Sequence, residues 1–266
     1  MSSAAATDAR AAYVLWRREV MKFFKHVSRI AGAVGQPLIF WLVLGAGLGE
    51  SFKAPGAAGD LPYLEYFYPG VLVMMLLFSA IFGTMSIIED RNEGFLQAVL
   101  VAAASRFALV SGKIGGAATV ALIQTGLFLI FLPWAGFPPG AVNWPLLIAA
   151  LVFGSIGLTG LGFCLAWWLD STTAYHAIMS VLLLPAWLVS GALFPAASAD
   201  GAIVFVMRLN PLTYIVELIR RALYGASPPA AELGLAGSTL ALELGIVAGF
   251  AIGSMVLATL LCSRRS

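Results

Sequence analysis

An all-α integral membrane protein with six transmembrane helices is the fold class that this sequence predicts. The 266 residues are 61% hydrophobic and only 11% charged, whereas about 25% of the residues of an ordinary soluble domain are charged. From residue 114 to residue 169 there is no Asp, Glu, Lys or Arg. Because a helix needs about 20 apolar residues to cross a bilayer, this run accommodates two spans and a proline-containing hairpin.

Four more apolar stretches flank this run, and none shows the ten-residue alternation of a transmembrane β-barrel strand. We expect the spans over residues 30–48, 67–88, 114–132, 146–169, 174–195 and 244–262. They form one transmembrane domain, residues 30–262, and the preceding residues 1–29 form a cytoplasmic amphipathic segment.

The distribution of basic residues predicts the orientation. With six spans, both termini lie on one side of the membrane. That side collects Arg10, Arg17, Arg18, Lys22, Lys25, Arg29, Arg91, Arg106, Lys113, Arg264 and Arg265. The opposite side holds Lys53, Arg208, Arg220 and Arg221. Since cytoplasmic loops carry the excess of Lys and Arg, we expect a multi-pass protein with both termini in the cytoplasm.

The N-terminal segment predicts an interfacial amphipathic helix. Aromatic residues such as Tyr13, Trp16 and Phe23 recur near one helical face, and basic residues lie mostly on the other. Such a helix lies along the membrane surface with its aromatic side chains among the headgroups and its basic side chains outward. It serves as an anchor, as a docking surface for a cytoplasmic partner, or as both. Its candidate residues are Trp16, Arg17, Arg18 and Lys22.

The loop between the second and third spans, residues 89–111, predicts a short amphipathic helix over residues 89–106. Its start is acidic, and apolar residues at helical spacing follow, namely Phe95, Leu96, Val99 and Leu100. Acidic groups near the N-terminus of a helix interact favourably with its dipole. A loop that only reconnects two spans could be much shorter. Two interpretations remain open, a solvated helix on the headgroups and a connector that transmits force from a cytoplasmic engine.

The segment before the last span, residues 196–228, predicts two short helices that do not cross the membrane. Asn210 can cap a helix and Pro211 suits its first turn, while Gly225 ends it. The resulting helix of about 13 residues is too short to span. Re-entrant backbone at membrane depth must be shielded by protein or line a wet cavity. The segment is therefore either an outer cap or gate, or a passive interfacial loop.

Smaller patterns predict how the helices pack. Glu217 and Arg221 are spaced for an i,i+4 ion pair, and Pro185 should kink the fifth span. A stripe of small residues on the last span permits close helix contact, and we expect it to pack within one subunit rather than form a dimer seam. The stripe consists of Gly245, Gly249 and Gly253.

The sequence lacks the residues that several classes of function require. Asp170, His176 and Glu243 all lie at span ends, whereas a proton relay or ion site would need charges at mid-depth. No HExxH or GxSxG motif occurs, and Gly112-Lys113 is followed by Ile114 rather than by the Ser or Thr of a P-loop. The sequence thus predicts no metal site, no catalytic residue and no ATPase site of its own.

Three segments, taken together, resemble one protein family. The first span contains Pro37-Leu38-Ile39-Phe40 and Gly45-Ala46-Gly47-Leu48-Gly49. The cytoplasmic loop contains Glu89, Arg91, Gly94, Leu96, Leu100, Ser105 and Arg106. The outer segment contains Asn210-Pro211-Leu212-Thr213-Tyr214 and Arg220-Arg221-Ala222-Leu223-Tyr224-Gly225. In this order and placement the chain resembles, over residues 13–262, the permeases of type-2 ABC exporters.

The resemblance implies a permease in the bacterial inner (plasma) membrane that exports an amphiphilic drug, lipid-linked saccharide or polysaccharide. It implies a homodimer, with spans one and five nearest its axis, on two copies of an ABC ATPase subunit. ATP and Mg would be bound by that partner, no cofactor by this chain, and we expect lipid contacts but no nucleic acid. The alternative is an ion- or proton-coupled secondary transporter, or a scaffold, without an ATPase.

The resemblance also assigns site residues. The residues expected to couple to the ATPase are Glu89, Asp90, Arg91, Glu93, Gly94, Ser105 and Arg106. The residues expected in the outer cap or gate are Asn210, Pro211, Thr213, Tyr214, Glu217, Arg220 and Arg221.

Overall fold

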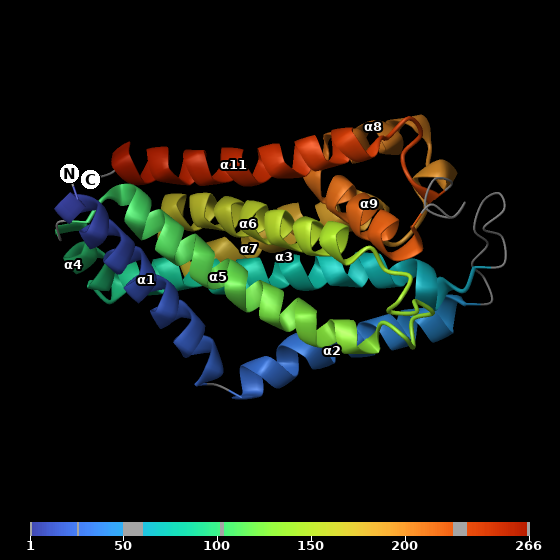
Figure 1. The fold of residues 1–266 in the computed structure, drawn as a ribbon, viewed down its shortest axis with the longest axis horizontal. Coiled ribbons are helices and arrows are strands. Elements are labelled where there is room, and N and C mark those ends of the chain that lie inside the picture. Colours follow the sequence, from blue (N-terminus) through green and yellow to red (C-terminus); the bar gives the residue numbers. More distant parts are fainter. Residues whose placement is uncertain (1, 26, 50–60, 102–103, 226–232, 265–266) are drawn as a thin grey trace.

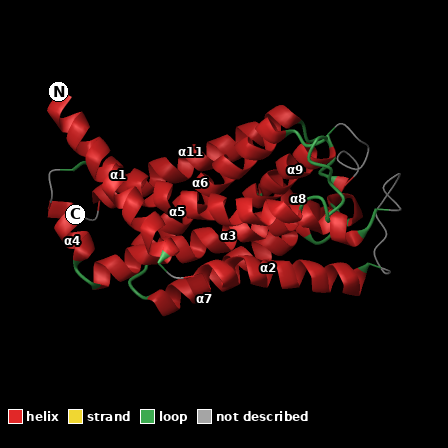
Figure 2. Cartoon of the chain, turned by 60° about the horizontal axis from the view of Figure 1, so that its bottom comes forward, coloured by secondary structure: helices red, strands yellow, loops and turns green. Residues whose placement is uncertain are grey.

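A computed structural model describes residues 2–25, 27–49, 61–101, 104–225 and 233–264. Within these ranges all regular elements are helical, and the long helices form an elongated bundle (Figures 1 and 2). Five helical segments in these ranges are long and apolar enough to cross a membrane: α3 (Tyr63–Asn92), α5 (Arg106–Phe128) continued by η2 (Leu129–Phe131), α6 (Trp144–Trp168), α7 (Thr172–Trp187) continued by η3 (Leu188–Ala192), and α11 (Leu240–Arg264). The chain is therefore an all-α integral membrane protein, as predicted.

The predicted first span corresponds to α2 (Val27–Leu48), whose described apolar part, Val34–Leu48, is shorter than a membrane crossing. The predicted short pair is α8 (Gly201–Leu209) and α9 (Pro211–Tyr224), which meet at an angle of 88°. Figure 1 shows α8 and α9 at one end of the bundle, which we call the cap end. Both termini and α4 (Phe95–Val101) lie at the opposite end, which we call the terminal end.

The centre of the bundle is α3. In its most apolar window 78% of the residues are buried, against 22% for α11. Its apolar residues surround the helix instead of forming a stripe, which is the pattern of a helix enclosed by others. The outer position of α11 leaves much of its surface for lipid or for another protein.

Glycines set the two closest helix contacts. On α5, a Cβ at Gly112 would lie 2.7 Å from the Ala12 carbonyl oxygen, and one at Gly116 would lie 2.6 Å from the Glu19 Cβ. Only glycine at these two positions lets α1 (Ser2–Phe24) approach α5 so closely. The same holds on α6, where Gly157 meets Phe250 and Gly160 meets Ser254 of α11.

Two packing predictions are wrong. The stripe Gly245, Gly249 and Gly253 does not pack within the subunit, because no described atom lies within 4 Å of a Cβ built on any of the three. The contact between α6 and α11 uses the glycines of α6 instead. The fifth span also breaks later than Pro185, at η3 (Leu188–Ala192), because Gly191 adopts a φ of 81° that interrupts the helix.

Candidate functional site: a cavity with a charged end

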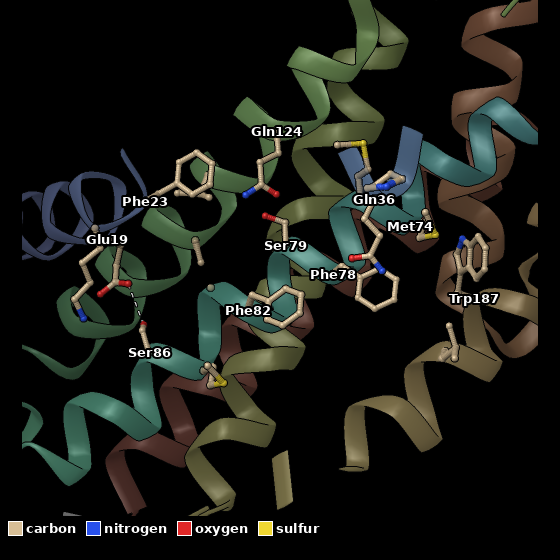
Figure 3. A pocket seen from close by; sticks show the side chains of 18 of the residues that line it. Glu19, Phe23, Gln36, Met74, Phe78, Ser79, Phe82, Ser86, Gln124 and Trp187 are labelled. Carbon is tan, nitrogen blue, oxygen red and sulfur yellow. Dashed lines mark hydrogen bonds between the residues drawn. The ribbon is translucent and has the colours of Figure 1, made fainter. Parts of the chain in front are cut away.

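A cavity of about 640 Å³ lies between α1, α2, α3, α5 and α7. Figure 3 shows Glu19 and Ser86 at one end, Trp187 at the other, and Ser79 and Gln124 between them. The lining residues are Glu19, Lys22, Phe23, Gln36, Pro37, Phe40, Met74, Met75, Phe78, Ser79, Phe82, Gly83, Met85, Ser86, Glu89, Ala117, Val120, Gln124, Leu184 and Trp187. Most of this wall is apolar, and one end is charged.

The apolar wall combines a fixed element with adaptable ones. Trp187 is buried, and its indole Nε1–H donates to the Gly70 carbonyl oxygen at 2.9 Å. Around it lie Met74 and Phe78, whose side chains Figure 3 shows facing the same space. Methionine side chains are flexible and polarizable, so they fit apolar groups of varied shape. This wall suits a hydrocarbon or aromatic group.

Polar groups are sparse along the middle of the cavity. Ser79 is buried, and its hydroxyl has no hydrogen-bond partner within the described part of the chain. Gln124 lies beside it on α5 (Figure 3). Since buried polar groups are nearly always paired, an unpaired hydroxyl on a cavity wall is available to a water molecule or a ligand.

The charged end holds a cluster of five ionic side chains from three helices, which we call the charge cluster: Arg18, Glu19, Lys22, Asp90 and Lys113. Asp90, fully buried, accepts from Arg18 at 2.6 and 2.7 Å and from Lys22 at 3.1 Å. Lys113 also donates to Asp90, and it donates to Glu19 at 2.6 Å. The second oxygen of Glu19 accepts from the Ser86 hydroxyl at 2.9 Å.

The cluster corrects two predictions about the N-terminal helix. Arg18 and Lys22 do not point outward but turn toward Asp90 on α3, and hydrogen bonding to that carboxylate raises the pKa of Arg18. The indole of Trp16 does not lie among headgroups, because it donates to the Thr119 hydroxyl of α5 at 2.9 Å. Arg17 is exposed as expected. The helix is therefore docked on the bundle through polar contacts as well as glycines.

The helix predicted over residues 89–106 is not one helix, because its first residues belong to α3 and only a short helix follows. Glu89 and Asp90 belong to the last turns of α3, so they do not begin the loop helix, and Asp90 is withdrawn into the charge cluster. The loop turns at Gly94, whose φ of 76° favours glycine. The loop helix is the short α4, with Glu93 just before it.

Three side chains fix this loop to its surroundings. Arg91 donates to the carbonyl oxygens of Leu169 and Trp167 and to the Asp170 carboxylate at 2.7 Å, which ties α3 to the turn between α6 and α7. Arg106 donates to the Leu100 carbonyl oxygen at 3.0 Å, at the end of α4. Ser105 caps α5 by accepting from the Ala108 amide. A second hollow of about 400 Å³ lies between α4 and the α6–α7 turn, lined by Arg91, Leu96, Gln97, Leu100, Trp167 and Asp170.

At the cap end the predicted helix start is present. The Asn210 side chain accepts from the Leu212 amide at 3.0 Å, Pro211 occupies the first turn, and the Tyr214 hydroxyl donates to the Arg208 carbonyl oxygen at 2.8 Å. Thr213 is fully buried.

The ion pairs of the cap are not the predicted ones. Arg221 pairs with Glu243 of α11 at 2.8 Å rather than with Glu217. Glu217 lies 3.5 Å from Arg220, an i,i+3 neighbour. Arg220, one of the residues expected in the outer cap, is fully buried and therefore does not reach headgroups or water. The broad apolar face of α9 packs inward and carries Arg220 with it.

Several residues that shape the site were not predicted from the sequence, above all Glu19, Lys113 and Trp187. In the sequence Lys113 stands out only as one of the basic residues that give the orientation, and Glu19 belongs to no predicted site. The signal that could have linked them is Gly112 and Gly116 around Lys113, because small residues four apart indicate a close helix neighbour.

Comparison with known proteins gives a consistent result. A model of the family described as ABC-2 type transporter matches residues 10–224. A protein of Cyanophora paradoxa named "Putative transport permease ycf38" is 31% identical over 216 residues, covering 78% of this chain and 72% of that protein. "Nodulation protein J" of Rhizobium meliloti is 26% identical over 260 residues, 94% of this chain and 92% of that protein. The protein of the same name from Sinorhizobium fredii is 26% identical over 259 residues, 94% of this chain and 92% of that protein.

Proposed function

This chain belongs to the ABC-2 type transporter family, and from that membership we propose that it is the membrane permease of an exporter driven by a separate ABC ATPase. The general assignment, that the chain is a multi-pass membrane transport permease, follows from the family and from the apolar helices. The export direction, the ATPase partner and the substrate class are the proposal. Both termini and α4 would face the cytoplasm, as the distribution of basic residues indicates.

The observation that carries the proposal is the cavity beside the charge cluster. A mostly apolar wall with a few polar groups and an ionic end has the chemistry of a site for an amphiphile, whose apolar part would lie against Phe78 and Trp187 and whose polar part would lie toward Glu19 and Lys22. A drug, a lipid-linked saccharide or the lipid end of a polysaccharide fits this description.

A homodimer is proposed because the cavity is bordered by helices with unpartnered apolar residues. Ile39 and Val43 of α2 are 64% and 62% exposed, and Val181 of α7 is 78% exposed. Two-fold pairing is the commonest closed assembly. Pairing across α2 and α7, the predicted first and fifth spans, would place two cavities along one axis. Cysteines along residues 38–46 and 180–190 should then crosslink between copies, whereas crosslinks only along α11 would favour its outward glycine stripe as the seam.

The coupling contact is proposed at α4 and the residues around it. The exposed side chain of Val101, the hollow beside Arg91, and Glu93 in the turn before α4 offer a partner a small amphipathic surface. Arg106, the first residue of α5, bonds to the Leu100 carbonyl of α4, and Arg91 of α3 bonds to the α6–α7 turn on the other side of the hollow. Both α3 and α5 line the cavity. Displacement of α4 by a partner would thereby be transmitted to the helices that line the cavity.

The alternative, an ion- or proton-coupled transporter or a scaffold, has one observation in its favour, the buried carboxylates of Glu19 and Asp90. Both are already paired with Lys or Arg, however, and the described residues contain no cluster of three metal-ligating groups. The test is to co-express the chain with an ABC ATPase subunit that carries Walker motifs and to purify both in lipid. We expect a stable complex whose ATP hydrolysis depends on this chain. Transport that follows an ion gradient without ATP would instead establish the alternative.

A further inference from the structure

The break in α7 leaves backbone groups that must be satisfied away from water. In η3, Val189 and Gly191 depart from helical geometry, with φ and ψ of −93° and 22° and of 81° and 7°. Such a break frees carbonyl oxygens that would otherwise accept bonds inside the helix. In a membrane protein each freed group must find a donor within the protein, because lipid supplies none.

The donors come from α3 and from the cap. The Gly191 carbonyl oxygen accepts from the Tyr66 hydroxyl at 2.6 Å and from Arg220 Nη2 at 2.9 Å. The Ala186 carbonyl oxygen accepts from the Asn210 side-chain amide at 2.5 Å. We call this set of four residues and their bonds the cap joint: Tyr66, Gly191, Asn210 and Arg220. It connects α9 directly to the broken helix.

Arg220 supplies more hydrogen-bond donors, and more charge, than this joint requires. A neutral donor could satisfy one carbonyl, whereas a guanidinium has five N–H groups and a charge that is costly to bury. Within the described part of the chain its Nε and Nη1 have no hydrogen-bond partner, and its counter-ion Glu217 lies 3.5 Å away. The Tyr66 ring lies 5.1 Å below it. A loosely paired donor of this kind can exchange acceptors when the cap moves.

The joint lies beside the cavity. Trp187, the last residue of α7 before η3, and Leu184 both line the cavity. Gly70 of α3 accepts from Trp187, and a Cβ at Gly70 would lie only 2.6 Å from that of Ala192. Because the packing there leaves no free space, displacement of the Gly191 carbonyl must be accommodated by movement of the neighbouring turn, which carries Trp187.

We propose that Arg220 is a positioning residue that transmits movement of the cap to the apolar wall of the cavity through the break in α7. This inference rests on the proposed transport function for its biological meaning. A displaced α9 would carry the guanidinium with it, pull or release the Gly191 carbonyl, and reorient the turn with Trp187 and Leu184. The state of the cap would thereby set the shape of the binding wall.

The test measures the cavity wall without requiring transport. The full chain, with Cys164 and Cys262 changed to Ser, receives Leu184→Cys as a reporter on the wall. It is reconstituted in vesicles of phosphatidylethanolamine and phosphatidylglycerol, and the rate of reaction with N-ethylmaleimide is measured. The test variant is Glu217→Gln with Arg220→Met, which removes both charges together so that no unpaired ion remains buried. Its control is Thr159→Val, which removes a buried hydroxyl of α6 whose hydrogen bond stays inside that helix, away from the cap and the cavity.

We expect the test variant to be folded, as judged by monodisperse extraction, and to change the reporter rate by about fivefold, the scale of one buried hydrogen bond. The control should leave the rate unchanged. Tyr66→Phe removes the other donor to Gly191 and should shift the rate in the same direction by less. Equal effects in test and control, or unchanged rates in every folded variant of the joint, would overturn the proposal. Because no ATPase or substrate is involved, this outcome is separate from failure of the proposed export function.

Discussion

The charge cluster and the cap joint are two buried ionic arrangements at opposite ends of one bundle, and they are built in contrasting ways. In the cluster, Asp90 accepts from three cations, and Arg18 and Lys22 still reach solvent with side chains 27% and 35% exposed. In the joint, Arg220 and Glu217 are each 1% exposed and 3.5 Å apart. The cluster has more bonds and keeps contact with water. The joint has fewer bonds, and its ionic side chain Arg220 is withdrawn from solvent together with Glu217.

This difference separates two uses of buried charge. A polar network whose members are all satisfied holds its elements rigidly, whereas one that is partly satisfied is easily rearranged. The cluster therefore fixes α1 to α3 and α5 and gives the cavity a constant charged end. The joint connects elements that must move if the cap opens. Four changes would break or sharpen this contrast.

The largest effect is expected from Asp90→Ala. It leaves three cations without their common acceptor, one of them the buried Lys113. Removing one partner of a buried ionic group destabilises a protein by about 3–5 kcal/mol. We expect a large loss of folded protein, measured as the monodisperse fraction after extraction and as resistance to denaturant. The matched control is Asp170→Ala. Its carboxylate also pairs with an Arg but is 81% exposed, and a surface pair contributes about 0–1 kcal/mol. Equal losses would refute the rigid role of the cluster.

A smaller effect is expected from Gly112→Ala, which tests whether close packing is what assembles the cluster. The added methyl group would meet the Ala12 carbonyl at 2.7 Å and the Leu15 Cβ at 2.9 Å, so α1 must move away. Overpacking of this kind costs about 1–3 kcal/mol. Crosslinking of a cysteine pair between α1 and α5 should fall together with stability. Gly126→Ala on the same helix has no described atom within 4 Å and should be neutral. An unchanged crosslink in Gly112→Ala would mean that the ionic bonds alone hold α1.

The contrast also shows what could be predicted from this sequence. The spans and the start of α9 depend on local composition, on runs of about 20 apolar residues and on Asn210-Pro211, and these predictions were correct in kind. The partners of Arg18 and Arg221, and the Gly191 carbonyl that accepts from Arg220, depend on which helices meet, and no local pattern contains that information. The burial of Arg220 in particular follows from its enclosure by Tyr66, Gly191 and Glu217, two of which lie on other helices.

Coupling to an ATPase should respond to residues beside the cluster rather than within it. Reversing the charges of Arg91 and Glu93 removes the bonds to the α6–α7 turn and alters the start of α4. We expect ATP hydrolysis stimulated by this chain to fall several-fold, while membrane insertion is unchanged, because the affected pair with Asp170 is exposed. Arg208→Glu, an exposed change at the opposite, cap end, serves as the control. Unchanged stimulation in reconstituted vesicles would exclude α4 and its surroundings as the coupling contact.

The smallest effect is expected at the outer edge of the terminal end, where Asp8 of α1 accepts from the Ser105 amide at 2.7 Å. That bond lowers the pKa of Asp8 below its ordinary 3.8. A carboxyl group with a depressed folded-state pKa contributes stability that is present above its unfolded pKa and is lost as the pH falls through the folded value. The contact should therefore be intact at neutral pH and be released only below about pH 4.

Hydrogen exchange at the Ser105 amide, corrected for the intrinsic rate, should show this as a loss of protection confined to acid. Global stability should change little because Asp8 lies near the surface and is only partly buried. Asp8→Asn keeps an acceptor but cannot titrate, so it should remove the pH dependence. The charge cluster should stay protected over the same range, since the carboxylate of Asp90 is bound by three cations. If protection at Ser105 instead disappeared near neutral pH, then α1 would be held only weakly at its start, and the rigid role given to the cluster would apply to the second half of α1 alone.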